Sequence, residues 1–257
     1  MRPEGMIGMY DPPSFLWALT LAGVIGMPAL TCVVLYGGAH RSGLGRKRAA
    51  LLAAAAVVVL GGWFATSAAI AGAGGYHTQL GKQLPWLPIT TVGVLVTLLV
   101  MTRIPAVAGA LAAPGTLSRL MLPHAFRVAG LAFLITMGLG HLPALFALPA
   151  GLGDIAVGIA APFVARRLAQ GTGYRRALWF NALGIIDLVV ALGLGGLTGF
   201  QIIHVTPAID ALTQLPLALI PTAAVPLLLA LHIVSARQLM SLVRTSRRAT
   251  PPVGAVT

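Results

Sequence analysis

Residues 15–36 read FLWALTLAGVIGMPALTCVVLY and contain no charged side chain. About 20 mainly apolar residues suffice for a helix to cross the ~30 Å hydrocarbon core of a bilayer, so this stretch predicts a transmembrane helix. It is longer than the apolar region of a secretory signal, which spans roughly 7–15 residues. Its positive cluster, residues 41–48, follows the stretch instead of preceding it. We therefore expect a retained first span with its N-terminus outside the cell.

The whole chain has the same apolar character. Of its 257 residues, 58% are hydrophobic and 9% are charged, with a mean hydropathy of +0.92. Because a soluble domain carries about 25% charged residues, water-soluble enzymes and nucleic-acid-binding folds are excluded. The composition predicts an all-α, polytopic transmembrane helical bundle. Its apolar runs indicate about seven spans, near residues 15–36, 49–71, 86–101, 125–140, 150–165, 177–196 and 215–236.

These spans are expected to form one transmembrane domain, residues 1–243, followed by a basic, proline-containing, disordered cytoplasmic tail, residues 244–257. Residues 125–165 allow two interpretations, a pair of spans or one span plus a re-entrant segment. Turn-like sequences at 140–143 and 148–151 favour the pair. Residues 104–122, which glycine and proline interrupt, are expected to form an inner interfacial loop.

The basic residues are distributed unevenly over this layout. The chain carries 17 Lys+Arg against 5 Asp+Glu. All the bases except Arg2 and Lys82 fall on one face, which the positive-inside rule assigns to the cytoplasm. The C-terminus then lies inside, in a cell (inner or plasma) membrane, and the bases are expected to contact anionic lipid head groups. Arg127 is counted with this inner set, its side chain extending to the interface.

Two acids, Asp154 and Asp187, lie within predicted spans. A charge in the hydrocarbon costs at least ~2.5 kcal/mol, so each is expected to face protein and to have a reason to be there. We expect both to line one outward-facing cavity and to bind a proton or a cation, with Asn181 as a further lining residue. The alternative is structural, with Asp154 capping the first turn of its helix and Asp187 bonding a neighbouring span.

Three histidines, His77, His141 and His204, fall in the three predicted outer loops. Together with Asp154 they form a weaker candidate for a zinc site that activates water. No paired-histidine spacing supports this site, and three unrelated loop histidines are the simpler interpretation. No cofactor is expected. His124 and His232 are placed towards the inner side without a recognisable partner.

The last predicted span carries Pro216, Pro221 and Pro226. Each proline lacks a backbone N–H and leaves a carbonyl without its helical donor, so this span is expected to be kinked. Such a kink is typical of a gate or a cation site, and it is also a bend that neighbouring helices tolerate.

The middle of the chain resembles a family of uncharacterised bacterial multi-pass membrane proteins. The resemblance covers residues 124–192 and rests on Arg127-x-x-Gly130-x-x-Phe133-Leu134, on Leu142-Pro143-x-x-Phe146-Ala147-x-Pro149-Ala150-Gly151-x-Gly153-Asp154, and on Asn181-x-x-Gly184-x-x-Asp187. It implies that these positions form one packed unit and carries no activity onto any residue.

Three functions remain open at this stage. The favoured one is a small-solute or ion/proton-coupled transporter with an outward-facing cavity around Asp154 and Asp187. The second is a membrane-embedded, metal-dependent enzyme that uses the outer-loop histidines. The third is a non-catalytic membrane assembly subunit, in which the two acids only hold helices together.

Overall fold

The computed structural model describes residues 11–77 and 84–249, and within these ranges it contains helices and no strands. The predicted all-α class is therefore confirmed. In chain order the elements are α1 (Ser14–Arg41), α2 (Arg46–Gly72), α3 (Trp86–Met101), α4 (Pro105–Ala112), α5 (Thr116–Arg119), the 3₁₀ helix η1 (Leu122–Gly130), α6 (Leu131–Gly138), α7 (Ala144–Ala169), α8 (Tyr174–Gly199), the 3₁₀ helix η2 (Asp210–Thr213), the π-helical turn η3 (Ile220–Ala224) and α9 (Val225–Ala249).

Six helical segments in the described ranges are long and apolar enough to cross a membrane, and a seventh is added if α3 and α4, bent by 82°, count as one span. One of the six, Thr116–Gly138, is assembled from α5, η1 and α6. It begins at Thr116, over two turns before the predicted start at residue 125. Much of the expected inner loop, residues 104–122, is therefore helical, in α4, α5 and the first residue of η1.

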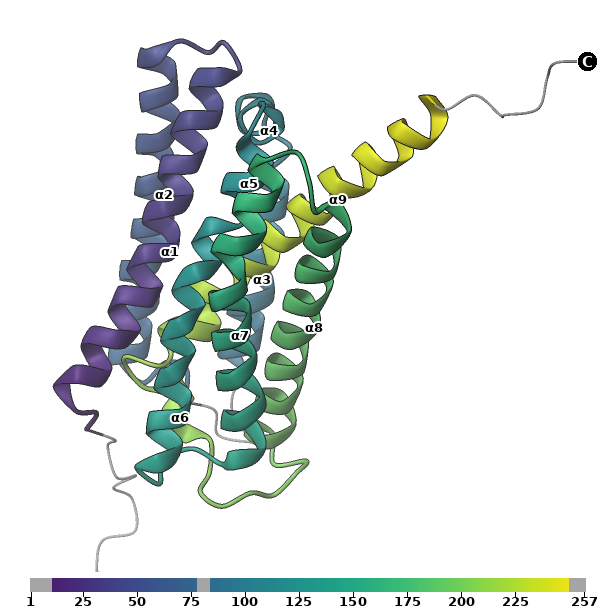
Figure 1. Ribbon diagram of the computed structural model, residues 1–257. Coiled ribbons are helices and arrows are strands. Elements are labelled where there is room, and N and C mark those ends of the chain that lie inside the picture. The colour runs from purple at the N-terminus through teal and green to yellow at the C-terminus, as the bar shows by residue number, and fades with distance from the viewer. Residues whose placement is uncertain (1–10, 78–83, 250–257) are drawn as a thin grey trace, which may run out of the picture.

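The helices form a bundle in which α7 is flanked by η1 and α6 on one side and by α8 on the other (Figure 1). Helix α8 packs on α9, and α9 packs on α3. Helix α1 contacts α2, α4 and η1, so it closes the bundle on the side away from α8. Most of the α9 surface in the bundle is buried, whereas α2 lies almost entirely on the outside.

A short turn after α6 sets the depth of the first acid. Gly140 has a positive φ of 79°, which glycine adopts without strain, and α7 begins directly after Pro143. Residues 125–165 thus form two helical segments joined by a turn at 139–143. The second predicted turn is wrong, because Pro149 lies inside α7. Asp154 therefore follows the start of α7 by ten residues, or roughly 15 Å of helical rise, and not by a single turn.

The last span is irregular, as its prolines predict. The π-helical turn η3 precedes α9 and contains Pro221. Pro226 lacks the N–H that would bond the Thr222 carbonyl, and the indole Nε1 of Trp63 donates to that oxygen instead, at 2.9 Å. The Thr91 hydroxyl likewise donates to the carbonyl of Pro221 at 2.9 Å. Side chains of α2 and α3 thus donate hydrogen bonds to backbone carbonyls of this turn.

Helix α9 continues to Ala249, so residues 244–249 of the predicted disordered tail are helical. The rest of that tail, and the outer residues Arg2, Glu4 and Lys82, lie outside the described residues.

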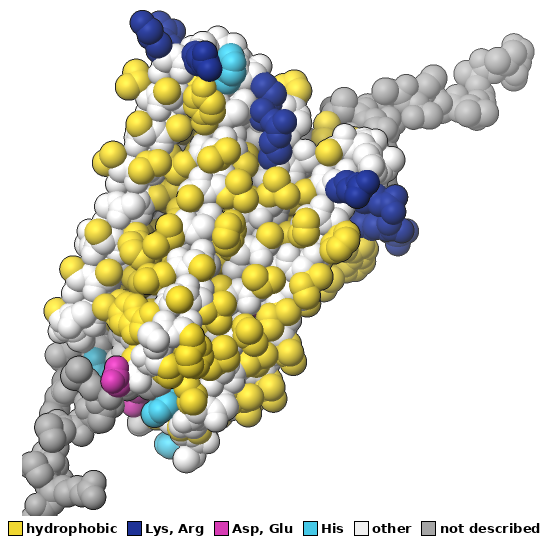
Figure 2. All heavy atoms as spheres, turned by 60° about the vertical axis from the view of Figure 1, so that its left-hand side comes forward, with side chains coloured by type: hydrophobic (Ala, Val, Ile, Leu, Met, Phe, Trp, Pro, Cys, Tyr) yellow, Lys and Arg dark blue, Asp and Glu magenta, His cyan; other side chains and the backbone are white. Residues whose placement is uncertain are grey.

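The surface separates into an apolar flank and a basic end. Figure 2 shows hydrophobic side chains over the length of the bundle, with Lys and Arg gathered at one end and acidic side chains near the other. The exposed bases include Arg41, Arg46, Lys47, Arg48, Arg166, Arg167, Arg175 and Arg176. This distribution, together with the six apolar helices, is compatible with a membrane protein.

Candidate functional site

Arg127 is the exception among the described bases, because it is 1% exposed and is one of the largest buried side chains. It lies in η1, in the interior of the Thr116–Gly138 segment. The expectation that its side chain extends to the inner interface is therefore wrong. The error follows from the misplaced helix start, since a span beginning at Thr116 puts Arg127 eleven residues, or about 16 Å, along the helix and not at its first turn.

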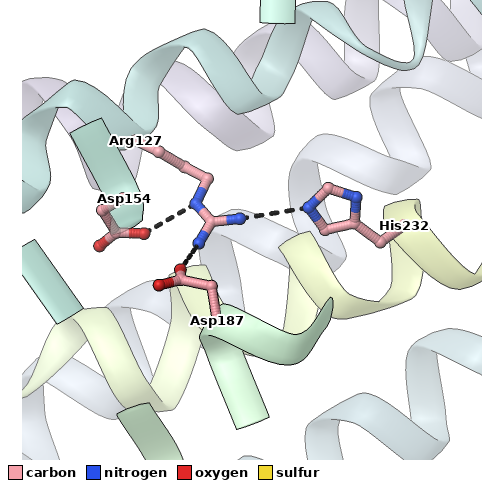
Figure 3. Close-up of polar contacts among 4 residues, drawn as sticks. All are labelled: Arg127, Asp154, Asp187 and His232. Carbon is pink, nitrogen blue, oxygen red and sulfur yellow. Dashed lines mark hydrogen bonds and ion pairs between the residues drawn. The ribbon is translucent and has the colours of Figure 1, made fainter. Parts of the chain in front are cut away.

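The guanidinium of Arg127 bonds to side chains from three other helices (Figure 3). Its Nε donates to Oδ1 of Asp154 on α7 at 2.7 Å, and its Nη2 donates to Oδ2 of Asp187 on α8. Its Nη1 donates to Nε2 of His232 on α9 at 3.2 Å. The two acids that the sequence singled out therefore meet on one cation, which sequence reasoning did not place with them.

The hydrogen-bond pattern defines the protonation of His232. Arginine only donates hydrogen bonds, so Nε2 of His232 must accept and its proton lies on Nδ1. That Nδ1 donates to Oδ1 of Asn181 at 3.0 Å, while the Asn181 amide nitrogen donates to the Ala177 carbonyl at 2.8 Å. Asn181 is fully buried and does not face the cavity described below. Its part is to hold the neutral histidine against Arg127.

With both acids ionised, the network carries more negative than positive charge. Two carboxylates face one guanidinium, and His232 is neutral in the tautomer just described. Within the described residues, Oδ2 of Asp154 and Oδ1 of Asp187 accept no hydrogen bond. The side chains of these acids keep 11% and 16% of their surface exposed, whereas that of Arg127 keeps none. An excess negative charge is therefore presented on the side of the acids away from the arginine.

Glycines allow the network to assemble. A Cβ atom at Gly153 would collide with the carboxylate of Asp187, and one at Gly184 would collide with the ring of His232. A Cβ at Gly130 would meet Asp154, and one at Gly158 would lie 2.7 Å from the backbone nitrogen of Val128. The absence of a side chain at these glycines thus permits close approach of the helices. Gly130, Gly153 and Gly184 belong to the segments quoted above, so the network lies within the packed unit that the resemblance implies.

Asp154 and Asp187 line one cavity of about 210 Å³. Phe133, Phe146 and Leu188 form part of its predominantly apolar wall. The cavity extends past the last residue of α8, Gly199, to Phe200 and the exposed Asp210. Because Arg175 and Arg176 mark the opposite end of α8, the cavity runs from mid-bundle towards the end that is poor in bases. The structural alternative for Asp154, capping a first helical turn, is excluded by its position deep in α7.

The structure groups the histidines differently from the sequence prediction. Among the described residues, no three His, Cys, Asp or Glu side chains lie close enough together to hold a metal ion. His77, His141 and His204 are therefore not brought together, and the weak hydrogen bond of His77 at 3.5 Å is to Thr213. His232 and His124, which had no predicted partner, instead stack on each other with ring centroids 3.8 Å apart.

His124 packs against the network through its stacking on His232. It is fully buried, its ring lies edge-on to Phe180, and neither ring nitrogen has a hydrogen-bond partner within the described residues. It therefore packs on the histidine that bonds to Arg127. The sequence offered one signal for the position of His232. Asn181 and Gly184 are spaced to lie on one face of α8, and His232 packs on that face.

Fold and site together define an all-α bundle with a buried, charge-imbalanced ion network at the side of an apolar cavity. Residues 84–240, more than half of the chain, match the family described as Domain of unknown function (DUF8737), and the chain belongs to that family. The match encloses residues 124–192, in agreement with the resemblance to an uncharacterised family. No curated protein and no solved structure matched the chain.

Proposed function

We propose that this protein is a polytopic integral membrane protein of the cell membrane that transports a small solute or cation in exchange for a proton. The observation that carries the proposal is the pair Asp154 and Asp187, which share one guanidinium and line one cavity. Ionisable residues inside membrane segments are costly and are typical of proton and ion pathways.

Orientation follows from the basic end of the molecule. With Arg46, Lys47 and Arg48 on the cytoplasmic side, the N-terminus lies outside and the C-terminus inside. The exposed arginines at the ends of α7 and α8 then contact anionic lipid head groups. The cavity in this orientation faces the outside.

Within the proposed cycle, Arg127 neutralises one carboxylate charge and the second charge is matched by a proton or a cation. Binding of a cation at the cavity displaces the proton, because both compete for the same unpaired oxygens, Asp154 Oδ2 and Asp187 Oδ1. Arg127 stays in place, since it is enclosed by protein on the remaining sides. The π-helical turn η3 contributes Pro221 to the cavity wall, so a change in this turn alters the cavity.

The test uses the full chain in proteoliposomes that contain a pH-sensitive dye. K⁺ is kept equal on both sides, and valinomycin clamps the membrane potential. A gradient of Na⁺ or of benzyltrimethylammonium is then imposed, and an internal pH change that depends on the protein is the expected result. Asp187→Asn should abolish the change, whereas Asp11→Asn, which removes an exposed acid outside the cavity, should leave it intact. Flux that survives in Asp187→Asn contradicts the role of this acid in coupling, and no flux with either cation contradicts coupled transport.

A further inference from the structure

The charged side chains of the cavity wall are all acidic in the described part of the chain. In the described part of the chain, the residues that line it include three acids, Asp154, Asp187 and Asp210, and no Lys, Arg or His. Arg127 lies behind the two inner acids and does not reach the cavity. Nearly all the remaining wall is apolar. An anion or a neutral polar molecule would find neither a countercharge nor enough hydrogen-bond donors there.

Aromatic rings form part of the same cavity wall as the acids. Phe133 and Phe146 pack edge-to-face with ring centroids 5.4 Å apart, and both line the cavity. An aromatic face attracts a cation and also packs against an apolar body, so the two rings suit a ligand that combines both properties. A hydrated inorganic ion satisfies only the acids and leaves this apolar surface in contact with water.

The volume limits the size of such a ligand. A buried apolar cavity of about 150 Å³ is large enough to bind benzene. The cavity here, at about 210 Å³, therefore takes one ring or a branched alkyl group together with a small charged head. The opening past Phe200 and Asp210 leaves a route of entry that passes a further negative charge.

We propose that the cavity binds a small hydrophobic monocation, an aromatic or branched alkyl ammonium, with its nitrogen at Asp154 and Asp187 and its apolar body against Phe133 and Phe146. The cation takes the place of one proton on the acid pair, so one positive charge enters as another leaves. This inference rests on the proposed function, whose cation it names by class, but the binding step is tested without transport.

The experiment is isothermal titration calorimetry of the purified full chain in detergent with benzyltrimethylammonium, whose permanent charge carries no proton of its own. Saturable binding accompanied by proton release is expected, and the release is measured by repeating the titration in buffers of different ionisation enthalpy. Two probes separate charge from shape: benzylsulfonate reverses the charge, and tetramethylammonium lacks the ring. Both should bind at least about tenfold more weakly, because one meets the acids as an anion and the other leaves the apolar wall unfilled.

Two variants locate the site. Asp187→Asn should weaken binding of benzyltrimethylammonium at least about tenfold and remove the proton release. Gly195→Leu fills the cavity beside Phe146 without touching the ion network, and should abolish binding even if the Asn variant fails to fold. Its matched control is Gly193→Leu, on the same helix but with open space around its Cα and no part in the cavity, which should bind as the parent does.

The inference is overturned if benzylsulfonate binds as well as benzyltrimethylammonium, or if Gly195→Leu binds like Gly193→Leu. Its failure is distinguishable from that of the proposed function. Proton flux driven by Na⁺ without binding of benzyltrimethylammonium contradicts the ligand class alone. Binding with proton release but without flux in proteoliposomes contradicts transport alone.

Discussion

Gly153 on α7 packs directly against the carboxylate of Asp187 on α8, so closely that a methyl group in place of its hydrogen would overlap an acid oxygen. The two residues belong to neighbouring helices, and their contact sets how near the second acid comes to Arg127. Backbone on one helix thus positions a charged group on the next.

Gly153→Ala should destabilise the protein, because the added methyl forces Asp187 away from Arg127 or separates α7 from α8. Overpacking of this kind costs typically about 1–3 kcal/mol. Thermal unfolding in detergent measures the effect, with Gly193→Ala as the control, since a Cβ there meets nothing within 4 Å. Equal melting temperatures for the two variants would show that α7 and α8 separate at no cost.

Arg127→Gln should be among the most damaging single substitutions, because it leaves two buried carboxylates without their countercharge. Removing one partner of a buried ion pair costs about 3–5 kcal/mol. The triple variant Arg127→Gln, Asp154→Asn, Asp187→Asn should recover part of that loss, since it removes the charges that Arg127 served. Measured unfolding free energies that simply add across the three sites would contradict one coupled network.

His232→Ala should leave Nη1 of Arg127 and Oδ1 of Asn181 without their partner. An unsatisfied buried polar group costs about 1–3 kcal/mol, so a clear loss of stability is expected. His204→Ala, at an exposed position, should have no measurable effect in the same denaturation experiment. A neutral outcome for His232→Ala would mean that the histidine only fills space.

Cysteine labelling in intact cells should place the basic end inside. The natural Cys32 is buried, so it gives little background. A membrane-impermeant thiol reagent should label His204→Cys in whole cells but label Ser42→Cys, in the turn between α1 and α2, only after permeabilisation. The reverse pattern would invert the orientation and place the cavity on the cytoplasmic side.

Sequence periodicity and charge located most of the helices and both acids, because a charge in a long apolar run is conspicuous. Arg127 was missed for the opposite reason. The residues before it, 104–122, are interrupted by glycine and proline and looked like a loop, so the arginine was placed at a helix end where snorkelling is normal. Pro149 led to a wrong prediction in a similar way. Proline next to glycine usually indicates a turn, but here Pro149 lies inside α7.

The role of His232 could not be predicted from the sequence, because it depends on tertiary contacts alone. Its partner Arg127 is 105 residues away along the chain, and only the approach of α9 to α8 at Gly184 brings its ring into the network. The cavity was likewise expected from Asp154 and Asp187, but its aromatic wall comes from α6 and α7 at positions that carry no local signal of a binding surface.

The π-helical turn that precedes α9 is held by Trp63 and Thr91, which come from α2 and α3, two helices with few buried residues. Any change in that turn must either break both hydrogen bonds or move α2 and α3 with it. If the exposed apolar faces of those helices contact acyl chains, as the proposed function requires, the viscosity and thickness of the bilayer act directly on any rearrangement of this turn.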